Sequence, residues 1–226
     1  MSTTHTPQAP DVANTQEMVV IHRIFRRGFP QLADLIRRTA PGDVRRAAPI
    51  GEHAEFVLDG LHNHHATEDE NIWPRLLERV APGADLIGRM EAQHHVVAEH
   101  IEQARLLLPK WKAAPDAASG AELADTLHRL GEALGRHLDE EEAEILPLIR
   151  THITGAEWRE FGKRAFDKFP DSAKLIALGQ MLEVADPREA AMFFGTLPVP
   201  VRLIWRLAGR RRYARYIRRV RGRDGR

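Results

Sequence analysis

The stretch that decides the fold is residues 64–74, HHATEDENIWP, because residues 137–147, HLDEEEAEILP, repeat its pattern. Each copy places a histidine four residues before a glutamate: His64 and Glu68, and His137 and Glu141. Residues four apart lie one above the other on a helix face, so each pair can reach one ion. Two such pairs facing each other bring two imidazoles and two carboxylates into one pocket. The repeat therefore predicts a metal site.

The overall composition is that of a soluble globular protein rich in helix formers, with 226 residues of which 43% are hydrophobic and 29% charged. The chain contains no run of about 18 uninterrupted apolar residues, so no transmembrane helix is predicted. The first residues lack the apolar core of a signal peptide. The absence of cysteine excludes disulfides, thiolate-bound iron–sulfur clusters and a cysteine nucleophile. The expected location is the cytoplasm.

Charge is distributed unevenly along the chain, although the net charge is only +1. Residues 198–226 contain eleven arginines and one acid, Asp224, so this end carries about +10 and the remainder about −9. All twelve histidines lie at or before His152. Histidine chemistry and positive charge thus belong to different parts of the chain.

Apolar residues at helical spacing predict an all-α protein with four long helices, at residues 15–39, 51–79, 84–110 and 121–150. A separate short helical piece is expected at residues 44–48. Gly28 and Pro30 predict a kink in the first long helix, and Pro74 predicts a bend or an end in the second. The expected domains are a disordered leader (1–14), the helical bundle (15–152) and a helical C-terminal extension (153–226).

One inward-facing histidine is predicted on each long helix: His22, His64, His94 and His137. A lone histidine on an apolar face is usually a core residue, but four buried imidazoles without a shared partner would be a costly core. In the first and third helices a methionine lies four residues before the histidine, Met18 and Met90. His22 precedes His64 by 42 residues, and His94 precedes His137 by 43, so the first two helices and the last two form a repeated pair. This repeated pair predicts an up-down-up-down four-helix bundle with a site between the pairs.

The neighbouring polar residues are assigned by helix face. His95 is predicted on the solvent face of the third helix, with His100 between the two faces, and His62 is predicted at the surface. The acids around the two repeats are expected to form a solvated face, with Asp69 and Glu142 as candidates for orienting the ligands. Histidine and carboxylate ligands without thiolates suit iron or manganese better than structural zinc.

The ordered set of these residues resembles the hemerythrin family, specifically the bacterial His-His-Glu (HHE) cation-binding domain. The resemblance covers about residues 15–150 and is carried by His22, the His64/Glu68 pair before Ile72-Trp73-Pro74, the run from Met90 to His94, and the His137/Glu141 pair before Ile145-Leu146-Pro147. It implies a non-haem centre of two iron ions. Glu68 and Glu141 are then bridging carboxylates, and His22, His64, His94 and His137 are terminal ligands.

The sequence departs from the oxygen-carrying hemerythrins at two places. Those proteins have a further histidine one turn after the third-helix ligand, where this chain has Ala98. They also use aspartate, one residue further from the last histidine, where this chain has Glu141. Both differences count against reversible oxygen carriage. His65, next to His64, is a candidate for the missing ligand, the alternative being a solvated or orienting residue.

The leading functional prediction is a protein whose di-iron site binds or reacts with dioxygen, hydrogen peroxide or nitric oxide. Two other classes stay open: a catalase-like oxidoreductase that disproportionates peroxide, and an iron sensor or store. A set of four histidines and two glutamates leaves more open coordination than five histidines, which favours reaction with peroxide.

The arginine-rich end is predicted to form a last amphipathic helix over residues 198–220, interrupted at Gly209. Three shorter helices are expected before it, at residues 156–168, 172–184 and 187–194. The favoured partner of its apolar face is the acidic bundle, since arginine stems can cover apolar surface while their charged ends pair with acids. An anionic membrane surface or another protein is the next alternative. Nucleic acid is not expected, because no reading motif accompanies the arginines.

Overall fold

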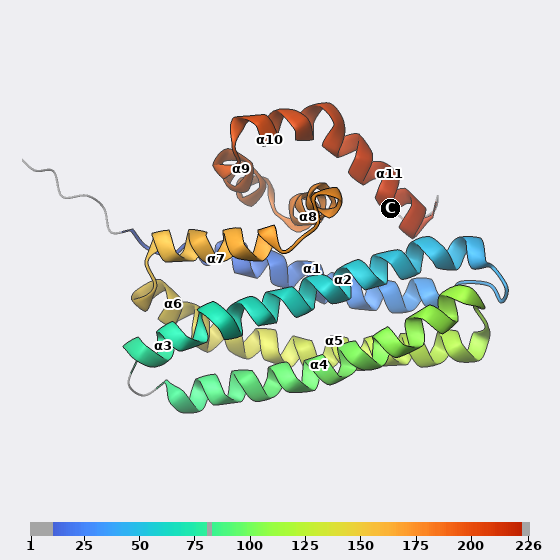
Figure 1. The fold of residues 1–226 in the computed structure, drawn as a ribbon, viewed down its shortest axis with the longest axis horizontal. Coiled ribbons are helices and arrows are strands. Elements are labelled where there is room, and N and C mark those ends of the chain that lie inside the picture. Colours follow the sequence, from blue (N-terminus) through green and yellow to red (C-terminus); the bar gives the residue numbers. More distant parts are fainter. Residues whose placement is uncertain (1–10, 81–82, 223–226) are drawn as a thin grey trace, which may run out of the picture.

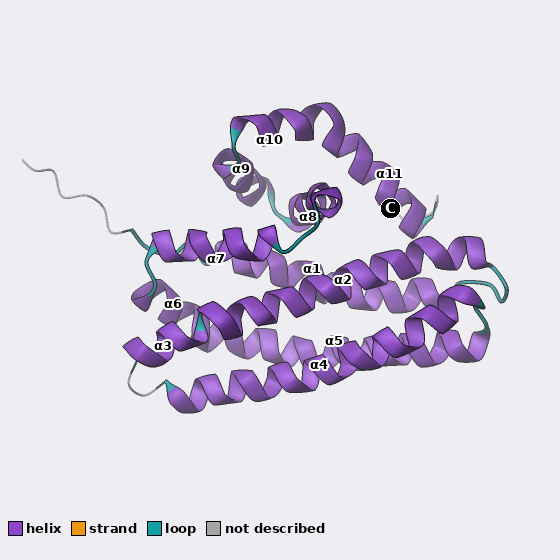
Figure 2. Ribbon diagram, in the orientation of Figure 1, coloured by secondary structure: helices purple, strands orange, loops and turns teal. Residues whose placement is uncertain are grey.

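A computed structural model describes residues 11–80 and 83–222. Within these residues every named element is a helix, and the only β-type pairing is an isolated bridge between Val12 and Thr154 (Figure 2). The predicted all-α class is confirmed. None of the described helices is long and apolar enough to cross a membrane.

Four long helical segments lie side by side in the first two thirds of the chain (Figure 1). They are α1 (Gln16–Arg37), α2 (Val44–Asn71) with α3 (Trp73–Arg79), α4 (Ala84–Ala113), and α5 (Ala117–Glu140) with η1 (Glu141–Ile145) and α6 (Leu146–His152). Helix α1 packs against α2 and α5, and α4 packs against the same two helices. Each segment therefore contributes one face to a shared interior.

The start of α2 differs from the prediction. The short piece at residues 44–48 and the helix expected from residue 51 form one helix, which passes through Pro49. The Asp43 side chain caps this helix by accepting a hydrogen bond from the Arg46 backbone N–H, and Ala47 and Ile50 are fully buried. Capping and burial outweigh the one backbone hydrogen bond that a proline removes. Helix α1 also contains a proline and continues through Gly28 and Pro30, where the kink or local irregularity stays a prediction.

The two repeated stretches are both irregular just after their glutamates. Helix α2 ends at Asn71, and α3 restarts with Pro74 in its first turn. In the second copy a π-helical turn, η1, begins at Glu141, and α6 restarts with Pro147 in its first turn. Proline has no N–H and its ring excludes a carbonyl four residues back, so both helices must adjust there. The bend predicted at Pro74 thus has a counterpart at Pro147.

Two apolar clusters fill the interior and leave a layer between them. The larger includes Phe29, Leu58 and Trp111, and the smaller includes Trp73 and Met90. Along every long helix the predicted histidine lies between residues of the two clusters; on α1, for example, His22 lies between Met18 and Phe25. Close packing on both sides holds this polar layer in place.

The C-terminal extension is also helical. It consists of α7 (Gly155–Asp167), α8 (Asp171–Val184), α9 (Pro187–Thr196), α10 (Val199–Ile204), η2 (Trp205–Gly209) and α11 (Arg210–Arg221). Helices α7 and α9 begin with reciprocal capping boxes, Thr154 with Glu157 and Asp186 with Glu189. The extension lies against one side of the four long segments, where α7 packs on α2, α8 on α1, and α11 on both α2 and α8 (Figure 1).

Residues 1–10 of the expected leader lie outside the described residues. Its last four residues, by contrast, are packed against the protein: Ala13 is buried, and Val12 pairs with Thr154. Asp11 accepts hydrogen bonds from the backbone of Ala156 and from Arg159. The expected disorder is therefore incorrect for residues 11–14, because contacts with the start of α7 fix them.

Candidate metal centre

The polar layer contains seven buried histidine and glutamate side chains, contributed by α1, α2, α4, α5 and η1. They form two groups that share Glu68: one has His22, His64, Glu68 and Glu141, and the other has His65, Glu68, His94 and His137. Within each group the potential ligand atoms lie within 4.8 Å of one another. All six residues predicted from the sequence are in these groups, together with His65.

In the first group, nitrogens and carboxylate oxygens converge. His22 Nε2 is 3.2 Å from Glu141 Oε2, and His64 Nε2 is 3.2 Å from Glu68 Oε1. His22 and Glu141 are fully buried, and Glu68 is 1% exposed. Such burial of ionisable groups requires a compensating charge.

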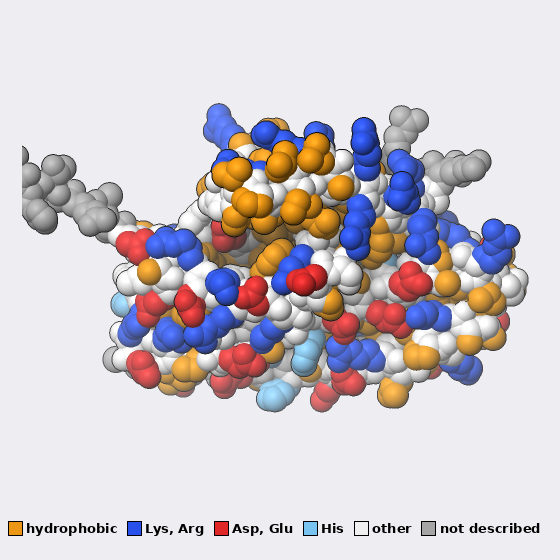
Figure 3. Space-filling model, turned by 45° about the horizontal axis from the view of Figure 1, so that its top comes forward, with side chains coloured by type: hydrophobic (Ala, Val, Ile, Leu, Met, Phe, Trp, Pro, Cys, Tyr) orange, Lys and Arg blue, Asp and Glu red, His pale blue; other side chains and the backbone are white. Residues whose placement is uncertain are grey.

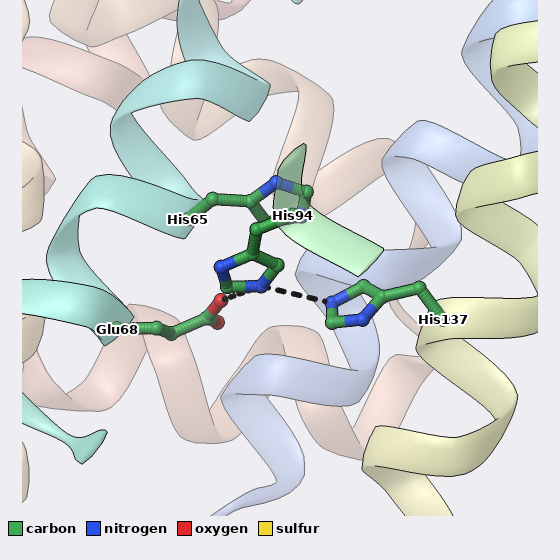
Figure 4. A group of neighbouring side chains, drawn as sticks. All are labelled: His65, Glu68, His94 and His137. Carbon is green, nitrogen blue, oxygen red and sulfur yellow. Dashed lines mark hydrogen bonds and ion pairs between the residues drawn. The ribbon is translucent and has the colours of Figure 1, made fainter. Parts of the chain in front are cut away.

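The second group shares Glu68 with the first and adds His65, His94 and His137 (Figure 4). His94 Nε2 is 3.4 Å from Glu68 Oε2 and 3.2 Å from His137 Nε2. The ring of His65 is stacked on the ring of His94, with centroids 4.0 Å apart. Glu141 Oε2 lies 3.6 Å from His137 Nε2, so this carboxylate also extends towards the second group.

Most of the atoms that converge in the layer have no hydrogen-bond partner. Among the described residues, eight buried side-chain atoms lack one, and seven of them belong to the cluster: the Nε2 atoms of His22, His64 and His65, and both carboxylate oxygens of Glu68 and Glu141. The N–O distances are in ion-pair range, yet the atoms face one another without hydrogen-bond geometry. Lone pairs directed at a common point are what a cation requires of its ligands.

The outer nitrogens of three imidazoles are hydrogen-bonded. Nδ1 of His22 is 2.8 Å from Glu142 Oε1, and Nδ1 of His94 is 2.7 Å from Asp69 Oδ1. An ionised carboxylate only accepts, so each Nδ1 carries a proton, and the inward Nε2 is the nitrogen that offers a lone pair when the ring is neutral. Asp69 and Glu142 thus occupy the orienting positions proposed for them from the sequence.

The third imidazole is oriented by Gln93, which was not singled out from the sequence. Nδ1 of His137 is 3.0 Å from Gln93 Oε1, while Gln93 Nε2 donates to Glu140 Oε2 at 2.7 Å. Glu140 in turn accepts from Arg89. Because Glu140 fixes which end of the amide is the donor, Gln93 presents its oxygen to His137. His137 therefore donates from Nδ1 and has its lone pair on Nε2, which faces Nε2 of His94.

A family model for the hemerythrin HHE cation-binding domain matches residues 14–149. The chain belongs to the hemerythrin family. Neither the curated proteins nor the solved structures give a match to it. The resemblance stated from the sequence is confirmed, and the His/Glu groups of this hemerythrin domain can hold a metal cation.

The electrostatics of the hemerythrin layer favour positive charge. Burial lowers the pKa of His22 and of His94, but carboxylates beside them outweigh this effect and raise the pKa of each to about 9. Burial, together with the nearby Glu141 carboxylate, raises the pKa of Glu68. Two carboxylates so close cannot both ionise cheaply without a cation between them. A metal cation meets this demand and leaves the imidazole nitrogens free to ligate.

The remaining imidazoles are held neutral. Burial lowers the pKa of His64 and His65 well below the ordinary value and lowers that of His137 to about 4. Neutral imidazole is the form that ligates a metal. These three side chains can therefore act as ligands at neutral pH without first losing a proton.

The structure also places the histidines whose roles were left open. His65 is buried and belongs to the second group, while the position of the additional family histidine, Ala98, faces solvent. The signal for His65 was present in the sequence, because Leu61, His65, Glu68 and Ile72 form one stripe at helical spacing. As predicted, His62 and His95 are exposed, and His100 is intermediate.

A small cavity reaches the hemerythrin site from the side of the extension. Its volume is ≈ 60 Å³, and it is lined by residues of α1, α2 and α7, among them His64, Glu68, Trp158 and Phe161. Trp158 and Phe161 of α7 are almost fully buried against this opening. The cavity has room for a few water-sized molecules only, so the extension limits what can approach the cluster.

Proposed function

We propose that the four long segments form an up-down-up-down hemerythrin bundle around a dinuclear non-haem iron centre. In this proposal the centre binds or reacts with dioxygen, hydrogen peroxide or nitric oxide. His22 and His64 hold one iron, and His65, His94 and His137 hold the other. Glu68 and Glu141 are the carboxylates between them.

The observation that carries the proposal is the position of Glu68. Its Oε1 lies 3.2 Å from His64 Nε2 in one group, and its Oε2 lies 3.4 Å from His94 Nε2 in the other. A carboxylate that turns one oxygen to each of two imidazole groups is placed to bridge two cations. Glu141 Oε2, between His22 and His137, supports the same arrangement.

The donor set and the cavity limit the metal and its ligand. Imidazole and carboxylate donors without thiolate suit iron, with manganese as the alternative. When bound, a pair of iron ions supplies electrons for exchange with small oxidants. The ≈ 60 Å³ cavity beside His64 and Glu68 accepts molecules the size of dioxygen, peroxide or nitric oxide and excludes larger substrates. Trp158 and Phe161 shield this approach from bulk water.

His65 bears on the choice between binding and turnover. Four imidazoles would leave coordination positions open for peroxide disproportionation, but a fifth imidazole, His65, lies in the cluster. A fifth ligand leaves fewer coordination positions open. This favours a protein that binds a small ligand over a catalase-like oxidoreductase, and an iron sensor or store is the remaining alternative.

Metal analysis of the purified full-length protein, with visible spectra before and after addition of each small ligand, tests the proposal. We expect about two iron ions per chain, as in carboxylate-bridged dinuclear bundles, and a charge-transfer band that changes with dioxygen, peroxide or nitric oxide. Iron that is retained without any spectral response to these ligands would favour the sensor or store. Sustained oxygen release from peroxide would favour the oxidoreductase.

Two alanine variants on neighbouring helices test the ligand set. His65→Ala removes a buried imidazole of the second group, so bound iron should fall clearly below that of the parent. His95→Ala removes an exposed imidazole of α4 and should leave iron content unchanged. Equal iron content in the parent and both variants would remove His65 from the site.

A further inference from the structure

The segment α10–η2 carries a row of exposed apolar side chains. Val199 is 66% exposed, Leu203 55%, Ile204 51% and Leu207 65%; these four residues are the apolar ridge. Single exposed apolar residues are common on soluble proteins, but a contiguous group marks an interaction surface. In Figure 3, hydrophobic side chains gather over the C-terminal segment, with Lys and Arg side chains beside them.

The arginines around the ridge lack acidic partners. Nine arginines lie in the described residues from Arg202 to Arg221. One of them, Arg221, forms an ion pair, with Glu183. The other eight form no ion pair with any described carboxylate: Arg202, Arg206, Arg210, Arg211, Arg212, Arg215, Arg218 and Arg219. Pairing with the acidic bundle therefore leaves most of this positive charge uncompensated.

The opposite side of the same segment is already docked on the protein. Trp205 is buried and lies near Tyr213, and Val220 is buried in the large apolar cluster. Arg46 of α2 donates to the backbone carbonyls of Arg219 and Val220. The ridge is thus held outward on a fixed helix, and the aromatic residues of this segment face the protein.

A cavity lies between the same segment and helices α8 and α9. Its volume is ≈ 500 Å³, and its walls include the apolar side chains of Leu182, Phe194 and Trp205. Arg206 and Arg210 also line it, together with Glu183, the partner of Arg221. Arginine next to an apolar recess complements the two parts of a phospholipid, an anionic headgroup and a hydrocarbon chain.

We propose that α10–η2 docks this hemerythrin protein on an anionic lipid bilayer. The apolar ridge enters the boundary between headgroups and acyl chains, and the surrounding guanidinium groups contact lipid phosphates. A helix with apolar residues on one face and arginines beside them lies in the plane of such an interface, and each arginine near an anionic surface adds attraction. The opposite side of the segment stays packed on the four long helices while the ridge contacts lipid, so the whole protein is held at the bilayer.

Lipid explains the two features together better than other partners do. Duplex nucleic acid would use the arginines but would leave Leu203 and Leu207 exposed to water. A second copy of this chain would bring the same eight unpaired arginines against one another, and like charges in contact oppose association. An anionic bilayer is the partner that satisfies both the charge and the apolar ridge.

Vesicle co-sedimentation of the full-length protein tests the proposal. The protein should bind vesicles of phosphatidylcholine mixed with phosphatidylglycerol, should bind phosphatidylcholine alone far less, and should be released by high salt. Leu203→Ser combined with Leu207→Ser should weaken binding by at least about tenfold, because two apolar side chains leave the interface. Arg211→Gln should weaken it by about fivefold.

The controls are an exposed leucine and an exposed arginine on the bundle. Leu106→Ser replaces a leucine of α4 that is 80% exposed, and Arg136→Gln replaces an exposed arginine of α5. Neither substitution should change vesicle binding. The ridge variants should keep the parent's circular dichroism and iron content. The proposal is overturned if the protein binds both vesicle types equally or binds neither. It is also overturned if the ridge variants bind vesicles as the parent does, or if the ridge mediates self-association or DNA binding instead.

Discussion

The interior of the bundle and the C-terminal helix each concentrate charge that the protein itself does not balance. In the interior, Glu68 and Glu141 are buried with seven atoms of the cluster lacking hydrogen-bond partners. At the C-terminal helix, eight arginines lack acidic partners among the described residues, and they lie along the segment that carries the exposed apolar side chains. The first imbalance calls for a small cation and the second for an extended anionic surface.

The two regions differ in how firmly they are held. The imidazoles of the interior are fixed by bonds that extend outward, as in the series from His137 through Gln93 and Glu140 to Arg89. The C-terminal helix is held on one side only, through Tyr216, Val220 and Arg221. A metal site needs ligands fixed on every side, whereas a docking helix needs one side free.

The largest effect should come from breaking the outward bonds of the candidate metal centre. Gln93→Leu removes the acceptor that orients His137, and loss of such a partner lowers metal affinity by about 10–100-fold. Iron titration against a competing chelator measures the change. Gln103→Leu, at an exposed glutamine of the same helix, is the matched control and should bind iron as the parent does. Equal affinities for the two variants would show that the centre needs no outward support.

The arrangement of the candidate ligands was largely predictable because it follows from helix periodicity. A histidine and a glutamate four residues apart share a face whatever the tertiary contacts, so His64 with Glu68 and His137 with Glu141 could be placed from the sequence. The same rule separated His94 from its neighbour His95. His65 stayed open because two adjacent residues of a helix can both reach a wide interior, and only the packing of the neighbouring helices decides this.

Contacts between distant parts of the chain could not be predicted. The hydrogen bond from His137 to Gln93 joins residues of two helices, and the bond from Arg46 to the carbonyl of Arg219 joins residues 173 positions apart. The continuity of α2 through Pro49 likewise depends on burial that the local sequence does not encode. The amphipathic pattern of the C-terminal helix was predictable, but which of its parts docks on the bundle was not.

The two ends of the C-terminal helix should respond differently to the same substitution. Val220 is 1% exposed, so Val220→Ala leaves a cavity in the large apolar cluster and should lower the free energy of unfolding by about 2 kcal/mol. Val199 is 66% exposed, so Val199→Ala should change the free energy of unfolding by less than about 0.5 kcal/mol. Denaturant unfolding measures both. Equal effects would contradict the one-sided docking on which the membrane proposal depends.

The smallest expected effect is the acid dependence of the contact that joins the extension to α1. Glu189 of α9 accepts hydrogen bonds from Arg23, from the Asp186 backbone N–H and from Gln16, and these bonds, chiefly those from Arg23, lower its pKa from 4.5 to about 2. A carboxylate whose pKa is lowered by folding contributes its full stabilisation above its unfolded pKa. This stabilisation is lost as the pH falls from about 4.5 towards 2.

The Glu189→Gln side chain cannot ionise, so this variant should be less stable than the parent at neutral pH by about 1 kcal/mol or less. Thermal unfolding of both proteins between neutral pH and pH about 3 should therefore show the difference shrinking as the pH falls. A difference that stays constant would mean that α9 is held by its apolar contacts, such as buried Phe193, and not by the ion pair.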